Sequence, residues 1–182
     1  VGFLGITTPL NLSRSRAPGS GCVDFDVRLK NMTPITSVEG IGRRFQELAS
    51  GLDVDPYYRT FHTSPQHDGS PHIEQVGAYF HFVVTDRGSE FERRKTTDPE
   101  EILYWLLDGV TQIAATNHEL RNRIEGTDGR EIWFPFQERL LYAMKSEWGV
   151  RKQQQHFRIL RDHPLRSKPF KDESEQDVTP NA

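Results

Sequence analysis

The stretch that specifies the architecture most strongly, residues 78–110, reads AYFHFVVTDRGSEFERRKTTDPEEILYWLLDGV. Its first part predicts a β-strand over 79–85, because aromatic and β-branched residues dominate there and alternate between two sides of an extended chain. One of these sides is wholly apolar and consists of Phe80, Phe82 and Val84. The tripeptide at 86–88 supplies turn chemistry, since its glycine takes a positive φ without strain. Residues 89–94 then return as a polar strand, which we expect near an edge of the sheet.

A helix follows the hairpin directly. Asp98 can cap its N-terminus, Pro99 suits its first turn, and Glu101 occupies the position from which a capping box reaches back. The apolar residues that follow recur at spacings of three and four. They are Ile102, Leu103, Leu106, Leu107, Val110, Ile113 and Ala114. We expect this apolar stripe to cover the apolar side of the hairpin.

The segments before the hairpin predict more strands and one helix. Helical spacing covers 37–52, and residues 57–62 form a candidate strand. Residues 64–71 have the composition of a loop, and residues 72–76 form a short strand that ends at a glycine. The short connections predict a meander of three or four antiparallel strands.

Three further helical segments follow residue 117. Residues 119–125 keep helical spacing up to Gly126, residues 130–144 form an amphipathic segment that starts or bends at Pro135, and residues 147–162 form a last helix. The residues expected to face the interior from the last two segments are Trp133, Phe136, Leu140, Leu141, Met144, Val150, Phe157 and Leu160. The fold class is therefore α+β, with a small antiparallel β-sheet packed on one face by C-terminal helices.

The chain has 182 residues, which favours a single domain with irregular ends. We place that domain at 36–164. Residues 1–35 are expected to be poorly structured or an extra segment, although residues 23–29 alternate like a short strand. Residues 165–182 are expected to be a disordered acidic tail.

Overall composition excludes several protein classes. The formal net charge is −3, so the molecule as a whole does not attract nucleic acid. The single cysteine, Cys22, excludes an intrachain disulfide framework and a multi-cysteine zinc site. No window approaches the roughly 20 apolar residues that cross a bilayer, and the N-terminus lacks the features of an export signal. The sequence predicts a soluble, cytoplasmic protein without a membrane partner.

Catalytic chemistry has little support. Four histidines lie around the strands, with Glu74 close to them, and raise the hypothesis of a metal site or a general base. They are His62, His67, His72 and His81. Their spacing matches no standard ligand motif, no serine lies in a nucleophile elbow, and no phosphate-binding loop is present. We predict no enzyme activity, no metal and no cofactor, with a small histidine-based hydrolase as an alternative.

Charge is distributed unevenly along the second half of the chain. Between residues 96 and 117 the only ionised residues are Asp98, Glu100, Glu101 and Asp108, which also suit the N-terminal dipole of a helix. Between residues 145 and 171 there are eight basic residues and two acids. This basic segment is the best argument for a nucleic-acid-binding module, the other alternative. Against it, no set of aromatic residues for base stacking separates the basic residues, so we predict no nucleic-acid partner.

Three short motifs resemble a known family. Arg-Gly at 87–88 is followed by acids and arginines, EILYW stands at 101–105, and ELRNRIE stands at 119–125. Together they are similar to the immunity protein 63 family of bacterial polymorphic toxin systems, over roughly residues 36–164. The matching positions are Tyr79, His81, Arg87, Gly88, Glu90, Arg93, Tyr104, Trp105, Glu119, Arg123 and Glu125. Departures from the family pattern are Pro135, Gly149 and the unmatched residues 1–34.

The resemblance implies a small α+β protein that holds a cognate toxin inactive without catalysis. Such an inhibitor needs a few anchor residues within roughly 800 Å² of its own surface. The prediction places this surface on the acidic start of the central helix, where Tyr104 or Trp105 would anchor a basic partner if exposed. The steering acids would be Asp98, Glu100, Glu101 and Asp108. The second choice is the hairpin around Arg87, Glu90 and Arg93.

Overall fold

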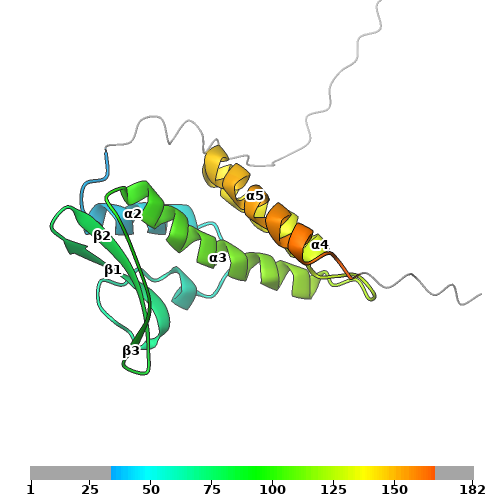
Figure 1. Cartoon of the computed structure of the whole chain (residues 1–182), viewed down its shortest axis with the longest axis horizontal. Helices are drawn as coiled ribbons and strands as arrows, with labels where there is room; N and C mark the ends of the chain where they lie inside the picture. Colours follow the sequence, from blue (N-terminus) through cyan, green and yellow to red (C-terminus); the bar gives the residue numbers. More distant parts are fainter. Residues whose placement is uncertain (1–33, 167–182) are drawn as a thin grey trace, which may run out of the picture.

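The computed structural model describes residues 34–166 (Figure 1). Its elements, in chain order, are α2 (Val38–Ala49), the short 3₁₀ helix η1 (Pro56–Arg59), β1 (Asp68–Val76), β2 (Tyr79–Asp86), β3 (Ser89–Thr96), α3 (Pro99–Arg121), α4 (Arg130–Met144) and α5 (Ser146–Asp162). The fold is α+β, as the sequence predicts. The strand expected at 23–29 and most of the acidic tail lie outside the described residues.

The sheet is a three-stranded antiparallel meander in the order β1-β2-β3. This confirms the predicted meander and places β3 at an edge. The β1–β2 turn contains Gly77 at φ 61°, and the β2–β3 turn contains Arg87 at φ 47° and Gly88 at φ 84°. A bulge in β3 shifts the register opposite Val84 and Thr85, which increases the local twist at this edge.

The prediction of a strand over residues 57–62 is wrong. Residues 56–59 form η1, because the Asp55 carboxylate accepts a hydrogen bond from the Tyr57 amide at 2.8 Å and Pro56 fits the first turn. Within this segment only His62 forms a β-bridge to the sheet, an isolated parallel bridge to His72. A local cap therefore prevails over the β propensity of the tyrosines.

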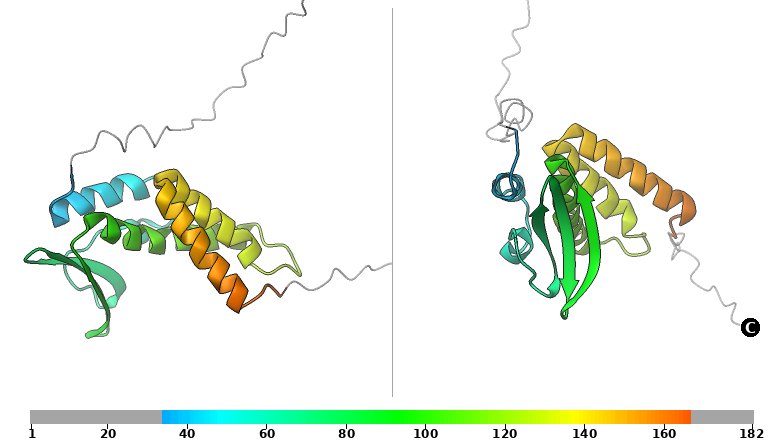
Figure 2. Two further views of the ribbon diagram at one scale, coloured as in Figure 1. Left: turned by 45° about the horizontal axis from the view of Figure 1, so that its top comes forward. Right: turned by 60° about the vertical axis from the view of Figure 1, so that its left-hand side comes forward.

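Helices cover one face of the sheet, and α3 is the element on which the rest packs. Helix α2 and the N-terminal part of α3 lie against the sheet, whereas α4 and α5 lie beside α3. Figure 2 shows the sheet edge-on and from its other side, where no helix of the described chain covers it. The predicted packing by helices on one face is correct, but the two last helices reach the sheet only through α3.

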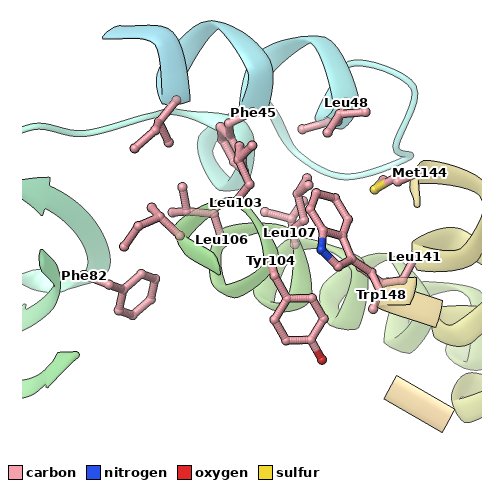
Figure 3. Close-up of a cluster of buried hydrophobic side chains, with 14 of the residues drawn as sticks. Phe45, Leu48, Phe82, Leu103, Tyr104, Leu106, Leu107, Leu141, Met144 and Trp148 are labelled. Carbon is pink, nitrogen blue, oxygen red and sulfur yellow. The ribbon is translucent and has the colours of Figure 1, made fainter. Parts of the chain in front are cut away.

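The core lies around α3 and confirms the predicted stripe. Leu103 and Leu107 are fully buried between Phe45 of α2 on one side and Trp148 of α5 on another, and Phe82 joins them from β2 (Figure 3). Of the predicted stripe only Ile113 is half-buried. Each buried side chain of this size contributes about 1.5–3 kcal/mol to folding, so the apolar stripe of α3 contributes substantially to stability.

The two ends of α3 correct two details. Asp98 caps the helix, since its carboxylate accepts a hydrogen bond from the Glu100 amide at 2.9 Å. The capping box is absent, because Glu101 turns away and binds Arg151 of α5 instead. At the other end α3 continues to Arg121 without a break, and residues 122–129 are not helical, so the expected helix over 119–125 is only partly correct.

The predicted inner face of α4 is largely correct, whereas that of α5 is mostly wrong. Leu141 and Met144 of α4 are buried, and Trp133, Phe136 and Leu140 are half-buried. In α4 the buried residues are Phe134, Gln137, Leu141 and Met144, and the helix runs through Pro135 from Arg130. In α5 they are Trp148, Gly149, Lys152 and His156, whereas Val150 and Phe157 are exposed. The expectation that Val150 and Phe157 pack against the core is wrong, and Leu160 is only half-buried. The inner face of α5 carries Lys152 and His156 beside Trp148 instead.

Candidate functional site

The acidic start of α3 is not a free surface. Glu100 accepts a hydrogen bond from the Lys145 ammonium at 2.9 Å, and Glu101 accepts two from the Arg151 guanidinium at 2.6 and 2.7 Å. Asp108 pairs with Lys152. The guanidinium of Arg151 lowers the pKa of Glu101. The acids of α3 therefore dock the start of α5 within the chain.

The proposed aromatic anchors are also less accessible than the sequence suggested. Tyr104 is only 2% exposed, and the Arg151 guanidinium carbon lies 3.9 Å from its ring centroid. Burial raises the pKa of Tyr104 to about 12. Trp105 is half-buried and packs edge-to-face on Phe82, with ring centroids 6.0 Å apart. The condition placed on Tyr104, that it be exposed, is not met.

The basic segment loses its continuity for the same reason. Lys145, Arg151 and Lys152 face the acids of α3, and Arg161 pairs with the adjacent Asp162 at 2.8 Å. Two of its lysines, at 168 and 171, lie outside the described residues. The acidic residues at the start of α3 and the first basic residues of the 145–171 segment therefore pair with each other across one contact between α3 and the start of α5.

A different cluster lies on the helix-free face of the sheet, where Arg93 of β3 is its centre. The Arg93 guanidinium donates hydrogen bonds to Glu90 at 2.9 and 2.7 Å and to Glu74 of β1 at 2.8 Å. It also lies 3.1 Å from Nδ1 of His81. The second Glu74 oxygen lies 3.2 Å from Nε2 of His72. Five side chains from three strands thus form one network, which we call the Arg93 network.

Strand register explains why these residues meet. Glu74 is the partner of His81 across β1 and β2, His72 is the partner of Val83, and Val83 is the partner of Arg93 across β2 and β3. Opposite residues point to the same side of a sheet. The network follows from the antiparallel pairing, since its residues come from positions that are distant in the sequence.

Ion pairs between Arg93 and two carboxylates hold the network together, and these three side chains remain partly exposed to solvent. Hydrogen bonding to Arg93 lowers the pKa of Glu74 and of Glu90, and these two carboxylates raise the pKa of Arg93. The side chains of Arg93, Glu74 and Glu90 are 37%, 34% and 44% exposed. Exposed ion pairs contribute little to stability. Their main consequence is that Arg93 is held in one orientation.

Apolar side chains surround the Arg93 network. Val76, Tyr79 and Phe91 are exposed by 59%, 47% and 71%. The Lys95 ammonium lies 5.3 Å from the Tyr79 ring centroid. Exposed aromatic side chains next to ordered charged groups are the typical composition of a protein-binding surface. We call this surface, the Arg93 network with Val76, Tyr79 and Phe91, the open sheet face.

The structure separates the residues singled out by the family resemblance into groups. Tyr79, His81, Glu90 and Arg93 lie on the open sheet face, and Arg87 and Gly88 form the adjacent turn. Glu119 and Arg123 form an ion pair at the end of α3, and Tyr104 lies in the core. The sequence pattern alone does not connect Glu74, Val76 and Phe91 with this face. Alternation along β1 and β3 shows which residues of one strand share a side. Only the strand register shows which residues of different strands meet.

The structure brings two of the four histidines together. His72 and His81 both touch the Arg93 network, whereas His62 meets the sheet through its backbone and His67 lies beside the β2–β3 turn. Within residues 34–166 there is no group of three or more histidine, cysteine or carboxylate side chains that could hold a metal ion.

Acid should weaken the Arg93 network. Because the folded-state pKa values of Glu74 and Glu90 are lowered, their contribution to stability is full above the unfolded value of about 4.3 and is lost as the pH falls through the lowered values. We expect the wild type to lose stability more steeply than Arg93→Met between about pH 5 and pH 3, measured by urea unfolding. Lys95→Met, a change on the same strand outside the network, should keep the wild-type slope. Equal slopes for Arg93→Met and wild type would contradict the assignment.

Comparison with known proteins agrees with the sequence resemblance. No helix of the described chain has the length and apolarity needed to cross a membrane. Searches of curated proteins and of solved structures found no match. The model of the family described as immunity protein 63 matches residues 77–158, a segment that runs from the β1–β2 turn into α5 and includes most of the open sheet face. Over this segment, which is a little under half of the chain, the protein is similar to the immunity protein 63 family.

Proposed function

We propose that the protein binds a cognate bacterial toxin and neutralises it by direct, non-catalytic contact. The match to the immunity protein 63 family supports a role in immunity against a toxin. The observation that carries the proposal is the open sheet face, which presents ordered charges and exposed apolar side chains where no helix of the described chain packs. A cytoplasmic location follows from this function, since the toxin must be held inactive inside the cell that makes it.

The proposed toxin contact is the β2–β3 hairpin and the open sheet face, with Arg87, Glu90 and Arg93 among the contacting residues. Phe91 and Tyr79 are suitable anchors, because large aromatic side chains supply much of the energy of protein interfaces. Arg93 is already oriented by Glu74 and Glu90. A pre-ordered side chain loses little conformational entropy on binding.

The acids of α3 take a structural role in this proposal. Glu100, Glu101 and Asp108 each have a basic partner from α4, α5 or the residue between them. A toxin that used them would first have to displace those partners. We therefore propose the hairpin as the main toxin contact, in place of the start of α3 with Asp98, Tyr104 and Trp105.

Phe91→Ala should reduce affinity for the toxin by about tenfold, since truncation of an interface anchor costs more than 1 kcal/mol. The binding partner is the toxin domain encoded immediately upstream, carrying an inactivating substitution, and affinity is measured by isothermal titration calorimetry. Phe157→Ala on α5 is the matched control, because Phe157 is 69% exposed and Phe91 is 71% exposed. Loss of binding in Phe157→Ala with full binding in Phe91→Ala would move the interface to α5.

A further inference from the structure

A cleft lies on the helix side of the sheet, opposite the open sheet face. It has a volume of about 450 Å³, within the range of about 300–1,000 Å³ that is usual for ligand pockets. Its walls come from α2, from η1, from all three strands and from the middle of α3. The residues that matter below are Tyr57, Tyr58, Arg94, Trp105, Gly109 and Gln112.

The walls of the cleft are aromatic and ordered. Tyr57 and Tyr58 meet edge-to-face with ring centroids 5.2 Å apart, although they are 48% and 46% exposed. On the opposite side the Arg94 guanidinium carbon lies 4.4 Å from the Phe82 ring centroid and 4.7 Å from that of Trp105. Such cation–π contacts hold Arg94 beside the two rings. The cleft therefore has two tyrosines on one wall and a guanidinium held beside aromatic rings on the other.

The acids that line the cleft are already used within the chain. Asp68 accepts a hydrogen bond from the Tyr57 hydroxyl at 2.6 Å, and Asp108 pairs with Lys152. The Tyr57 interaction lowers the pKa of Asp68 to about 2. Both carboxylates thus already have a partner within the chain, and apolar and aromatic side chains make up most of the lining.

Gly109 is the second, independent observation. It lies in the interior of α3, it is exposed, and a Cβ built on it would have no atom within 4 Å. Glycine in a helix interior destabilises the helix by about 0.5–1 kcal/mol relative to alanine. Nothing in the described chain approaches closely enough to require glycine at this position. A group from another protein that packs against Gly109 would explain why a glycine stands at this position.

We infer that this cleft receives a large apolar side chain from a loop of the toxin, seated against Gly109 between Tyr58 and Trp105. The inference rests on the proposed function and extends it to a second contact region. The adjacent residues Arg93 and Arg94 of β3 point to opposite faces of the sheet. The open sheet face and the cleft therefore meet at the β3 edge, and one partner that wraps this edge can contact both. The occupant has apolar chemistry, because apolar and aromatic side chains make up most of the lining.

Gly109→Leu tests the inference by filling the cleft. We expect at least a tenfold loss of affinity for the inactivated toxin domain encoded immediately upstream, measured by isothermal titration calorimetry. The thermal midpoint of the variant alone should not fall. Thr116→Leu is the matched control, since Thr116 is exposed two turns further along α3 and does not line the cleft. It should bind as the wild type does.

Tyr58→Ala provides a second measurement that does not depend on α3. Its side chain is half exposed, so truncation should leave the fold intact while weakening toxin binding several-fold. Wild-type affinity in Tyr58→Ala and in a folded Gly109→Leu would overturn the cleft as a contact region and leave the proposed function standing. If Gly109→Leu does not fold, wild-type affinity in Tyr58→Ala is sufficient to overturn it. A wild-type protein that does not bind the toxin would overturn both.

Discussion

Gly149→Ala is expected to lower the free energy of unfolding by about 2–3 kcal/mol, as forced overpacking does. A Cβ at Gly149 would lie 2.5 Å from Cβ and 2.7 Å from Cα of Tyr142. One of these atoms belongs to the backbone of α4, so the clash is relieved only if α4 and α5 move apart. Urea unfolding followed by circular dichroism measures the change. Gly149, a departure from the family pattern, is thus the position that permits the close approach of the last two helices.

Gly109→Ala is the matched control for this prediction. Both glycines lie in helix interiors, but a Cβ at Gly109 meets nothing within 4 Å. Alanine should therefore raise the free energy of unfolding by about 0.5–1 kcal/mol through its better helix propensity. The two substitutions are chemically identical and should have opposite signs. A stabilising Gly149→Ala would show that α4 and α5 are not packed at this distance.

Lys152→Met should lower the free energy of unfolding by about 3 kcal/mol, the usual result of removing one partner of a buried ion pair. The side chain of Lys152 is 9% exposed and that of its partner Asp108 is 28% exposed. Methionine retains most of the volume of the lysine stem, so the effect reports the charge. After the change Asp108 keeps a hydrogen bond from the Gln137 amide at 3.1 Å, which does not neutralise it.

Two further variants separate charge from packing. Arg158→Met, on the same helix at an exposed position, should change stability by less than about 0.5 kcal/mol. The double variant Asp108→Asn with Lys152→Met removes both charges and should recover much of the loss, because no unpaired buried charge remains. The single variant Asp108→Asn completes the comparison. If the loss of unfolding free energy in the double variant equals the sum of the losses in the two single variants, Asp108 and Lys152 are not coupled.

Local sequence determined the parts of the fold whose signals lie within a few residues. The hairpin follows from an alternating strand and a glycine turn, and the observed turn places Gly88 at φ 84°. Helix α3 begins where Asp98 and Pro99 predicted, and six of the seven residues in its apolar stripe are buried. The motifs for the family lie in the same block. Each of these features depends on chemistry that residues carry with them along the chain.

Tertiary structure alone decided which charges are free and which side of the last helices is buried. Glu101 resembled a capping residue and Arg151 part of a basic surface, yet each satisfies the other across 50 positions. Lys152 and His156 are buried while Phe157 is exposed, so hydropathy indicated the wrong side of α5. The Arg93 network required the strand register to bring Glu74 beside His81. The physical reason is common to all three cases: a charged group is buried, paired or free according to partners that chain folding brings from distant positions, and no local pattern encodes them.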